Sequence, residues 1–181
     1  DEYIEKVRQQ EYIYPENYVK LRFLENHDQP RAKKLINDER LLKIWTAYMY
    51  FQKGTVLLYG GQEAKDRNTP SLFDIDKVNW NDLDEDFTEY LRNLGSMKKK
   101  QIFAYGKYNI HRLEKRGVIY ITYEDESSIM AGIFNVENKI GHIETRLNDG
   151  IYENIIDNSS IEVRDGKVKL EDKAIIFEIR K

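Results

Sequence analysis

Two stretches of the chain carry apolar residues at the spacing of an amphipathic α-helix. From Asp38 to Lys53 these residues recur at intervals of three and four positions, which places them on one helix face. Asn37 or Asp38 can accept the first free amide hydrogens of this helix, and Gly54 suits a position just past its end. A second helix is predicted from Asp84 to Lys100, whose apolar face comprises Phe87, Tyr90, Leu91 and Leu94.

Two shorter apolar runs precede these helices and predict β-strands. The first is Tyr18 to Leu24, and the second, Thr55 to Tyr59, is apolar nearly throughout, as is typical of a parallel strand covered on both faces. Both runs end in polar clusters, at residues 25–29 and 60–63. The order strand, helix, strand, helix indicates parallel strands joined by a crossover helix. This pattern fits both an open α/β sheet and a closed barrel.

The pattern changes near residue 100, after which short strands alternate with turn residues. Apolar positions alternate on both sides of Asp165-Gly166, a dipeptide typical of a type I′ hairpin turn. Residues 118–123 and 128–135 predict a second hairpin, and residues 174–179 a closing strand. Strands at this spacing without helices favour an antiparallel β-sandwich. We therefore predict an α/β part over residues 1–100 and an independently folding all-β part over residues 101–181.

The composition removes several classes of protein and of chemistry. The 29 Lys and Arg residues are balanced by 32 Asp and Glu residues, so the formal charge of −3 gives no basic field for nucleic acid. No stretch approaches the roughly 20 apolar residues of a membrane-spanning helix. With no cysteine and three histidines, the chain has carboxylates, hydroxyls and amines left for catalysis. We expect no nucleic-acid and no membrane partner, and the compartment is not encoded in this segment.

The most informative polar cluster is Asn26-His27-Asp28, which follows the first predicted strand. It presents an amide, an imidazole and a carboxylate at the carboxyl end of that strand, where α/β folds bind their ligands. A plainer interpretation is also open. Asn26 and Asp28 could cap a short helix at residues 31–36 while His27 packs against its neighbours.

An acidic stretch before the second helix does not have the pattern of a calcium site. Counted from Asp82, an EF-hand loop requires glycine at its sixth position and glutamate at its twelfth. The chain has Phe87 and Asn93 at those places. We therefore interpret Asp84 and its neighbours as helix-capping residues, and we expect no metal site and no cofactor in this chain.

Three motifs follow one another in the first part of the chain. They are Leu21-Arg-Phe-Leu-Glu-Asn-His-Asp-Gln-Pro-Arg31, Gly54-Thr-Val-Leu-Leu-Tyr-Gly-Gly-Gln-Glu63, and Ser71-Leu-Phe-Asp74 with Val78-Asn-Trp80. In this order they resemble the alpha-amylase superfamily of glycoside hydrolases. The resemblance implies an α/β partial (β/α)8 barrel, consisting of its last two βα units, followed by an all-β antiparallel sandwich. Residues 101–181, with Leu147-Asn-Asp-Gly-Ile-Tyr152, are similar to the C-terminal sandwich of that family.

The resemblance also implies roles for individual residues. Asp28 corresponds to the family's third catalytic carboxylate, a transition-state stabiliser that binds sugar hydroxyls without attacking the bond. His27, Asn26 and Arg31 correspond to substrate-binding residues. Because the sugar ring becomes cationic during glycosidic cleavage, a fixed carboxylate beside it lowers the barrier. For Arg31 a second interpretation is open, namely a solvated or carboxylate-paired arginine that does not contact the sugar.

The other two catalytic groups of the family have no match in this chain. In the family the nucleophile and the acid/base residue come from earlier barrel strands. Retaining hydrolysis requires both carboxyl groups, about 5–5.5 Å apart. We therefore expect the 181-residue chain alone to be inactive. Glu25 and Glu63 lie outside the catalytic motifs, and Glu63 is expected to hydrogen-bond loop backbone.

Two functions fit this sequence. The first is the C-terminal portion of an alpha-amylase-like retaining glycoside hydrolase that acts on α-glucosidic bonds of starch-type oligo- or polysaccharides. The alternative is a noncatalytic carbohydrate-binding or scaffolding module of the same ancestry. An α-glucan or a maltooligosaccharide is the expected partner in both, and any calcium would lie in regions outside this chain. Because the two parallel strands would have unpaired edges and an uncovered apolar face, we also expect self-association.

Overall fold

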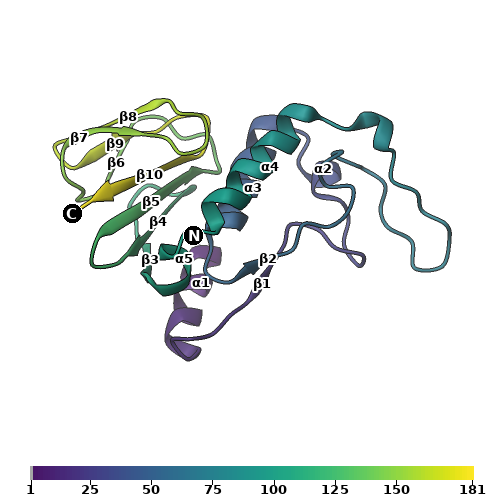
Figure 1. The fold of residues 1–181 in the computed structure, drawn as a ribbon, viewed down its shortest axis with the longest axis horizontal. Helices are drawn as coiled ribbons and strands as arrows, with labels where there is room; N and C mark the ends of the chain where they lie inside the picture. Colours follow the sequence, from purple (N-terminus) through teal and green to yellow (C-terminus); the bar gives the residue numbers. More distant parts are fainter. Residues whose placement is uncertain (1) are drawn as a thin grey trace.

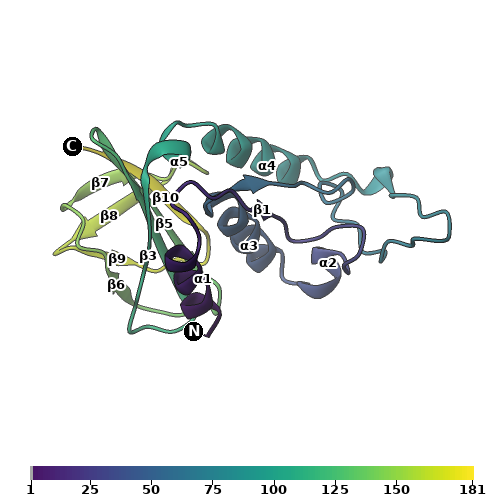
Figure 2. The ribbon, with the colours of Figure 1, turned by 90° about the horizontal axis from the view of Figure 1, so that it is seen from below.

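The computed structural model, which describes residues 2–181, places a β-sandwich at one end of an elongated molecule. The loops that follow two parallel strands lie at the other end (Figures 1 and 2). The first part of the chain contains α1 (Glu2–Ile13), β1 (Leu21–Arg22), α2 (Ala32–Leu35), α3 (Glu39–Phe51), β2 (Thr55–Val56), a 3-10 turn (Trp80–Asp82), α4 (Glu85–Lys98) and α5 (Ile102–Tyr105).

The strands β1 and β2 pair in parallel, as the order of elements predicts. Leu21 lies opposite Thr55, and Arg22 lies opposite Val56. Both strands are shorter than the apolar runs that predicted them. Backbone hydrogen bonds from Thr55 to Lys20 and from Leu57 to Arg22, both 2.9 Å, flank the paired residues. The parallel pairing, with α3 between the strands, confirms the strand–helix–strand unit.

The two predicted long helices are present at the expected positions. The carboxylate of Asp38 accepts hydrogen bonds from the amides of Arg40 and Leu41 at 2.9 and 3.2 Å, which fixes the start of α3. Past its end, Gly54 adopts a φ of +116°, and a Cβ at this position would lie 2.2 Å from the carbonyl oxygen of Lys20. Only glycine therefore allows the chain to turn from α3 into β2 so close to the segment before β1.

Two helices were missed by the sequence pattern. The helix α1 is largely polar, and Val7 is its one fully buried residue. It lies beside β3 in both views (Figures 1 and 2), and Arg112 pairs with Glu5 of this helix at 3.7 Å. The short helix α5 lies within the region predicted to be all-β. Among residues 2–181, no helix is both long and apolar enough to cross a membrane.

The second part of the chain forms two four-stranded antiparallel sheets with the strand orders β10-β5-β4-β3 and β6-β9-β8-β7. Both predicted hairpins are present. In the turn between β8 and β9, Asp165 and Gly166 have φ values of 50° and 64°, as a type I′ turn requires. The strands are β3 (Lys107–His111), β4 (Val118–Glu124), β5 (Ser128–Asn135), β6 (His142–Glu144), β7 (Gly150–Glu153), β8 (Ser160–Arg164), β9 (Lys167–Lys169) and β10 (Ile175–Arg180).

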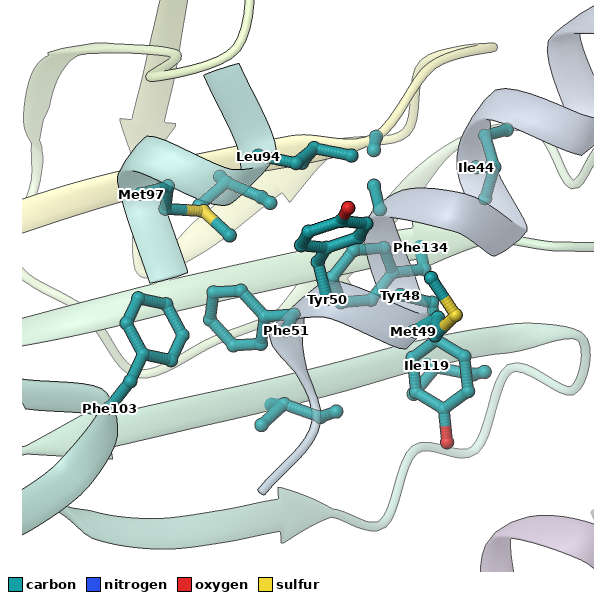
Figure 3. Packing of buried hydrophobic residues seen from close by; sticks show 14 of the residues in the cluster. Ile44, Tyr48, Met49, Tyr50, Phe51, Leu94, Met97, Phe103, Ile119 and Phe134 are labelled. Atoms are coloured by element: carbon teal, nitrogen blue, oxygen red, sulfur yellow. The ribbon is translucent and has the colours of Figure 1, made fainter. Parts of the chain in front are cut away.

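The sheet β10-β5-β4-β3 is buried on both faces. One face packs against the other sheet through residues that include Tyr120, Ile133 and Phe177. The opposite face packs against α3 and α4, where Phe134 of β5 meets Phe51 of α3 with ring centroids 5.5 Å apart (Figure 3). This three-layer arrangement explains why β4 and β5 are apolar almost throughout.

The shared core joins the two predicted parts of the chain. Phe51, at the end of α3, contacts the rings of Phe103, Tyr123 and Phe134, all of which belong to the second part. The hydroxyl of Tyr123 also donates to the carbonyl oxygen of Phe51 at 3.0 Å. This packing favours cooperative unfolding of the helices with the sandwich, in place of the independent folding expected from the sequence.

The long loop between β2 and α4 is fastened to both helices by a network of charges. Lys65 lies 2.7 Å from a carboxylate oxygen of Glu39, at the start of α3. It also lies 2.6 Å from a carboxylate oxygen of Asp84, the residue that caps α4 by accepting the Phe87 amide hydrogen. Lys33, the second residue of α2, pairs with Glu39 as well. The loop is thereby held against the helices at its inner end.

A Gly132→Ala substitution tests the shared core. A Cβ at this position in β5 would lie 2.8 Å from the Phe51 ring, so we expect a loss of about 1–3 kcal/mol in unfolding free energy. The matched control is Gly95→Ala in α4, where a Cβ meets no atom within 4 Å, and a gain of about 0.5–1 kcal/mol is expected. Urea unfolding read by circular dichroism and by tyrosine fluorescence measures both. Two separate transitions, with only the sandwich affected by Gly132→Ala, would contradict the shared core.

The charge network predicts a loss of stability in acid. Hydrogen bonds from Lys65 and from the Phe87 amide hold the pKa of Asp84 below its ordinary value of 3.8. Burial alone would raise the pKa of Glu39, but hydrogen bonds from Lys33 and Lys65 bring it below 4.5. Groups with lowered pKa values stabilise the fold above their ordinary pKa, and this contribution disappears as the pH falls through the lowered value.

We therefore expect the urea midpoint to fall between about pH 6 and about pH 3, and to fall less in Asp84→Asn than in the parent chain. Asp76→Asn, on the exposed part of the same loop, is the control. An equal fall in all three proteins would exclude the network as the source. Glu25 contributes a pH dependence of the opposite sign, because burial raises its pKa. Since Glu25 is present in all three proteins, its contribution does not affect the comparison.

Candidate functional site

The sequence-predicted site forms a tight turn at the carboxyl end of β1. The side-chain oxygen of Asn26 accepts the amide hydrogen of Asp28 at 2.9 Å, and the carbonyl oxygen of Asn26 accepts that of Gln29 at 3.3 Å. Asn26 therefore shapes the turn. The alternative that Asn26 and Asp28 cap the following helix is wrong, since the cap position of α2 is Arg31 and its first amide hydrogen, on Ala32, is accepted by the carboxylate of Glu25.

The turn presents His27 and Asp28 to solvent. Their side chains are 62% and 56% exposed, and Nε2 of His27 lies 3.2 Å from Oδ2 of Asp28. The pair thus combines a carboxylate that accepts hydrogen bonds with an imidazole that can donate one. Both groups are accessible to hydroxyl groups of a bound ligand.

Arg31 lies in a different environment from His27 and Asp28. Its side chain is 2% exposed, and Nη1 donates to Oε1 of Glu25 at 2.8 Å. The structure therefore agrees with the carboxylate-paired interpretation of Arg31 and does not bring its guanidinium to the surface beside His27 and Asp28. Burial raises the pKa of Glu25 above its ordinary value, although Arg31 and the Ala32 amide stabilise the ionised form.

The polar cluster after β2 lies next to this turn, because the strands are parallel and their carboxyl ends meet. The carboxylate of Glu63 accepts the amide hydrogen of Gly61 at 3.0 Å, as the sequence analysis expected. Glu25 is 1% exposed and Glu63 is bonded to its own loop. Glu25 is thus buried and paired, and Glu63 has the loop-backbone contact that the sequence predicted.

The loop after β2 has an exposed apolar tip that the sequence pattern did not predict. The loop after β2 runs outward beyond α2, at the end of the molecule opposite the sandwich (Figures 1 and 2). It carries three apolar side chains with exposed fractions of 65–93%, Leu72, Phe73 and Ile75. Ser71 and Asp74 hold the tip in a turn through the Ser71 hydroxyl. The tip therefore exposes three apolar side chains to solvent.

The sandwich contains a hollow that is separate from the turn at residues 26–29. It has a volume of about 1030 Å³ and is lined by both sheets, with His111 and His142 on its walls. His111 bonds to the hydroxyl of Thr122 at 2.8 Å and stacks on Tyr120, and burial lowers its pKa. These contacts account for His111 as a packed residue. Among residues 2–181, no group of three or more His, Asp or Glu side chains is arranged to hold a metal ion.

Comparison with known families places the site in context. Residues 1–115 match the family model described as alpha amylase, catalytic domain. Residues 109–177 match the one described as bacterial alpha amylase C-terminal domain. The two matches meet where the helical part of the fold passes into the sandwich.

Individual relatives agree with these matches. A curated relative, alpha-amylase 2 of Dictyoglomus thermophilum, is 22% identical over 76% of this chain, and the match covers 26% of that protein. The solved alpha-amylase of Lactobacillus plantarum is 27% identical over 98% of this chain, with a TM-score of 0.89. The maltogenic alpha-amylase of Thermotoga neapolitana is 23% identical over 99% of this chain, with a TM-score of 0.88.

The matched part is 42% of the Lactobacillus plantarum enzyme and 46% of the Thermotoga neapolitana enzyme, so this chain spans less than half the length of these relatives. Since one family model covers residues 1–115 and the other covers most of the sandwich, the chain belongs to the alpha-amylase family of glycoside hydrolases.

Proposed function

We propose that this chain is the C-terminal portion of a retaining glycoside hydrolase that cleaves α-glucosidic bonds in starch-type oligo- or polysaccharides. Asp28 stabilises the cationic transition state, and His27 binds a hydroxyl of the same sugar ring. The observation that carries the proposal is the exposed pair of Asp28 and His27 at the carboxyl end of β1, within the residues that match an alpha-amylase catalytic domain.

The chemistry of the pair supports this role. A carboxylate that accepts a sugar hydroxyl interacts more strongly with the sugar as the ring becomes positively charged. It therefore stabilises the transition state more than the ground state. The neighbouring imidazole supplies a donor for the adjoining hydroxyl. Asn26 contributes by shaping the turn that aims both side chains, and its amide nitrogen is an additional donor.

The substrate class is supported by two relatives solved with sugars. The structure of the alpha-amylase from Geobacillus thermoleovorans is described as a complex with acarbose, and another relative is described in complex with maltotriose. These ligands are oligosaccharides of the kind that the Asp28–His27 pair suits. We extend this class of ligand to the parent enzyme of the present chain.

The strands β1 and β2 are proposed to be the last two strands of a (β/α)8 barrel. Along the β1 segment, the alternate residues Val19, Leu21 and Phe23 are 72%, 55% and 40% exposed, although all three are apolar. In a closed barrel this face would pack against the remaining strands. The exposed face therefore indicates where the rest of a catalytic domain packs.

We expect the 181-residue chain alone not to hydrolyse a chromogenic maltooligosaccharide, since it has no match for the nucleophile or the acid/base residue. A chimera in which this chain replaces the matching part of the Lactobacillus plantarum alpha-amylase is expected to be active, because the two backbones agree closely. In the chimera, Asp28→Asn should lower kcat by about 100-fold or more, as a transition-state contact is lost. Asp76→Asn on the neighbouring loop is the matched control and should leave kcat unchanged.

Two outcomes would contradict the proposal. One is turnover by the isolated chain that survives repurification and is lost in Asp28→Asn. The other is a chimera that folds and cleaves its substrate equally well with Asp28→Asn. The noncatalytic alternative would instead be supported if the isolated chain bound maltotriose in the sandwich hollow, with binding lost in His142→Ala and unchanged in Asp28→Asn.

The uncovered strand face also predicts self-association of the isolated chain. Light scattering on eluted fractions should give a mass at least twice that of the 21.6 kDa chain at high concentration. Leu21→Glu should restore the monomer, because it places a charge in the apolar face. Ile151→Glu, at an apolar position on the sandwich that is more exposed still, should not change the mass. A monomer in the parent chain at high concentration would contradict the expectation.

A further inference from the structure

The turn that carries His27 and Asp28 is closed at its base by two buried side chains. Glu25 directly precedes the turn, and Arg31 follows Pro30 at its other end. Oε1 of Glu25 accepts from Nη1 of Arg31 at 2.8 Å, while Oε2 accepts the amide hydrogen of Ala32 at 2.6 Å. Both carboxylate oxygens are thus used to bring together the two ends of the turn.

Arg31 also holds the segment that follows β2. Its Nη1 donates to the carbonyl oxygen of Gly60 at 2.9 Å, and its Nε donates to that of Asn68 at 3.3 Å. The guanidinium lies over the ring of Tyr59, with 4.6 Å between its central carbon and the ring centroid. One side chain therefore links the end of β1, the end of β2 and the start of the long loop.

The space around the guanidinium is closely fitted. Gly61 has a φ of +96°, and a Cβ at this position would lie 3.1 Å from Nη2 of Arg31 and 2.9 Å from the side chain of Val78. A glycine is therefore required both by the backbone conformation and by the approach of the guanidinium. Lysine at position 31 could not reproduce the three separate donor directions of this arrangement.

We propose that Glu25 and Arg31 form a positioning pair that holds Asp28 and His27 in the orientation needed for transition-state binding, without contacting the sugar. The proposal rests on the function proposed above for Asp28. A carboxylate that stabilises a developing charge acts well only when its orientation is fixed before the reaction. The pair supplies that fixation, because it closes the base of the turn and joins it to the adjoining loop.

The test separates positioning from general stability. It uses hydrogen–deuterium exchange of the full 181-residue chain, read by mass spectrometry. The reporters in the turn are the amides of Asp28 and Gln29, which bond to Asn26. The reporters in the adjoining loop are the amides of Gln62, Ala64 and Asp66. Reference peptides come from β4 and β5.

In Arg31→Lys and in Glu25→Gln, the reporter amides should exchange about tenfold faster or more, with β4 and β5 unchanged. The control is Tyr120→Phe, which removes a buried hydrogen bond of 3.1 Å to the Thr145 carbonyl in the sandwich. It should leave the reporters unchanged. If neither Arg31→Lys nor Glu25→Gln folds, Tyr59→Leu removes the ring beneath the guanidinium while keeping both charges, and it should accelerate the same reporters by about threefold.

Exchange of the reporter amides at the parent rate in Arg31→Lys would overturn the proposal. So would equal acceleration in Tyr120→Phe, since that result would mean a general loss of stability. A separate measurement tests the proposed function. Adding maltotriose to the parent chain should slow the hydrogen–deuterium exchange of the turn amides. Faster exchange in the variants without such protection would leave the positioning pair in place and count against the sugar-binding role.

Discussion

A carboxylate and a guanidinium that are almost fully removed from water, Glu25 and Arg31, determine the geometry of this end of the molecule. Removing two charges from water costs several kcal/mol per ion, and the cost is offset only when geometry is favourable and every remaining donor and acceptor finds a partner. Here both oxygens of Glu25 are used, and Arg31 reaches two further carbonyl oxygens. Nη2 of Arg31 also lies 3.7 Å from Oδ2 of a second buried carboxylate, Asp66, in the loop after β2. Since a shift of either loop would break several of these contacts together, they favour one arrangement of the two loops.

The sandwich supports the same arrangement from the other side. The helix α3 connects β1 to β2, and its end is packed through Phe51 into the outer face of the sheet β10-β5-β4-β3. The position of β2 relative to β1 is thus coupled to the sandwich core. In this view the sandwich acts as a packing domain, and its contribution to the site is indirect. The resulting molecule combines a packed support with an exposed apolar face along β1.

Much of this fold follows from local patterns in the sequence. The helices α3 and α4 each have an apolar stripe at helical spacing and a capping aspartate. In both helices the two signals predict the same starting point. The hairpin at Asp165-Gly166 is specified by a dipeptide that tolerates positive φ at both positions. By contrast, α1 is polar with a single fully buried residue, and no local signal distinguishes it from a loop. The strands β1 and β2 pair over two residues each, fewer than their apolar runs predicted.

In the candidate site, too, some features follow from the local sequence and others depend on residues that are distant in the chain. The exposed pair of His27 and Asp28 could be located from its motif, because residue type and position after a strand suffice. The burial of Arg31 could not, since its partners Gly60 and Asn68 lie 29 and 37 residues away and meet it only in the folded chain. The role of Gly61 was hidden for the same reason, as its neighbours come from two distant segments.

The most direct test of the account is a crystal structure of this chain soaked with acarbose. The account requires sugar hydroxyls within hydrogen-bonding distance, about 2.6–3.2 Å, of both the Asp28 carboxylate and the His27 imidazole. It also requires Glu25 and Arg31 to stay paired beneath the turn. Acarbose bound in the sandwich hollow, with the turn at residues 26–29 empty, would contradict it.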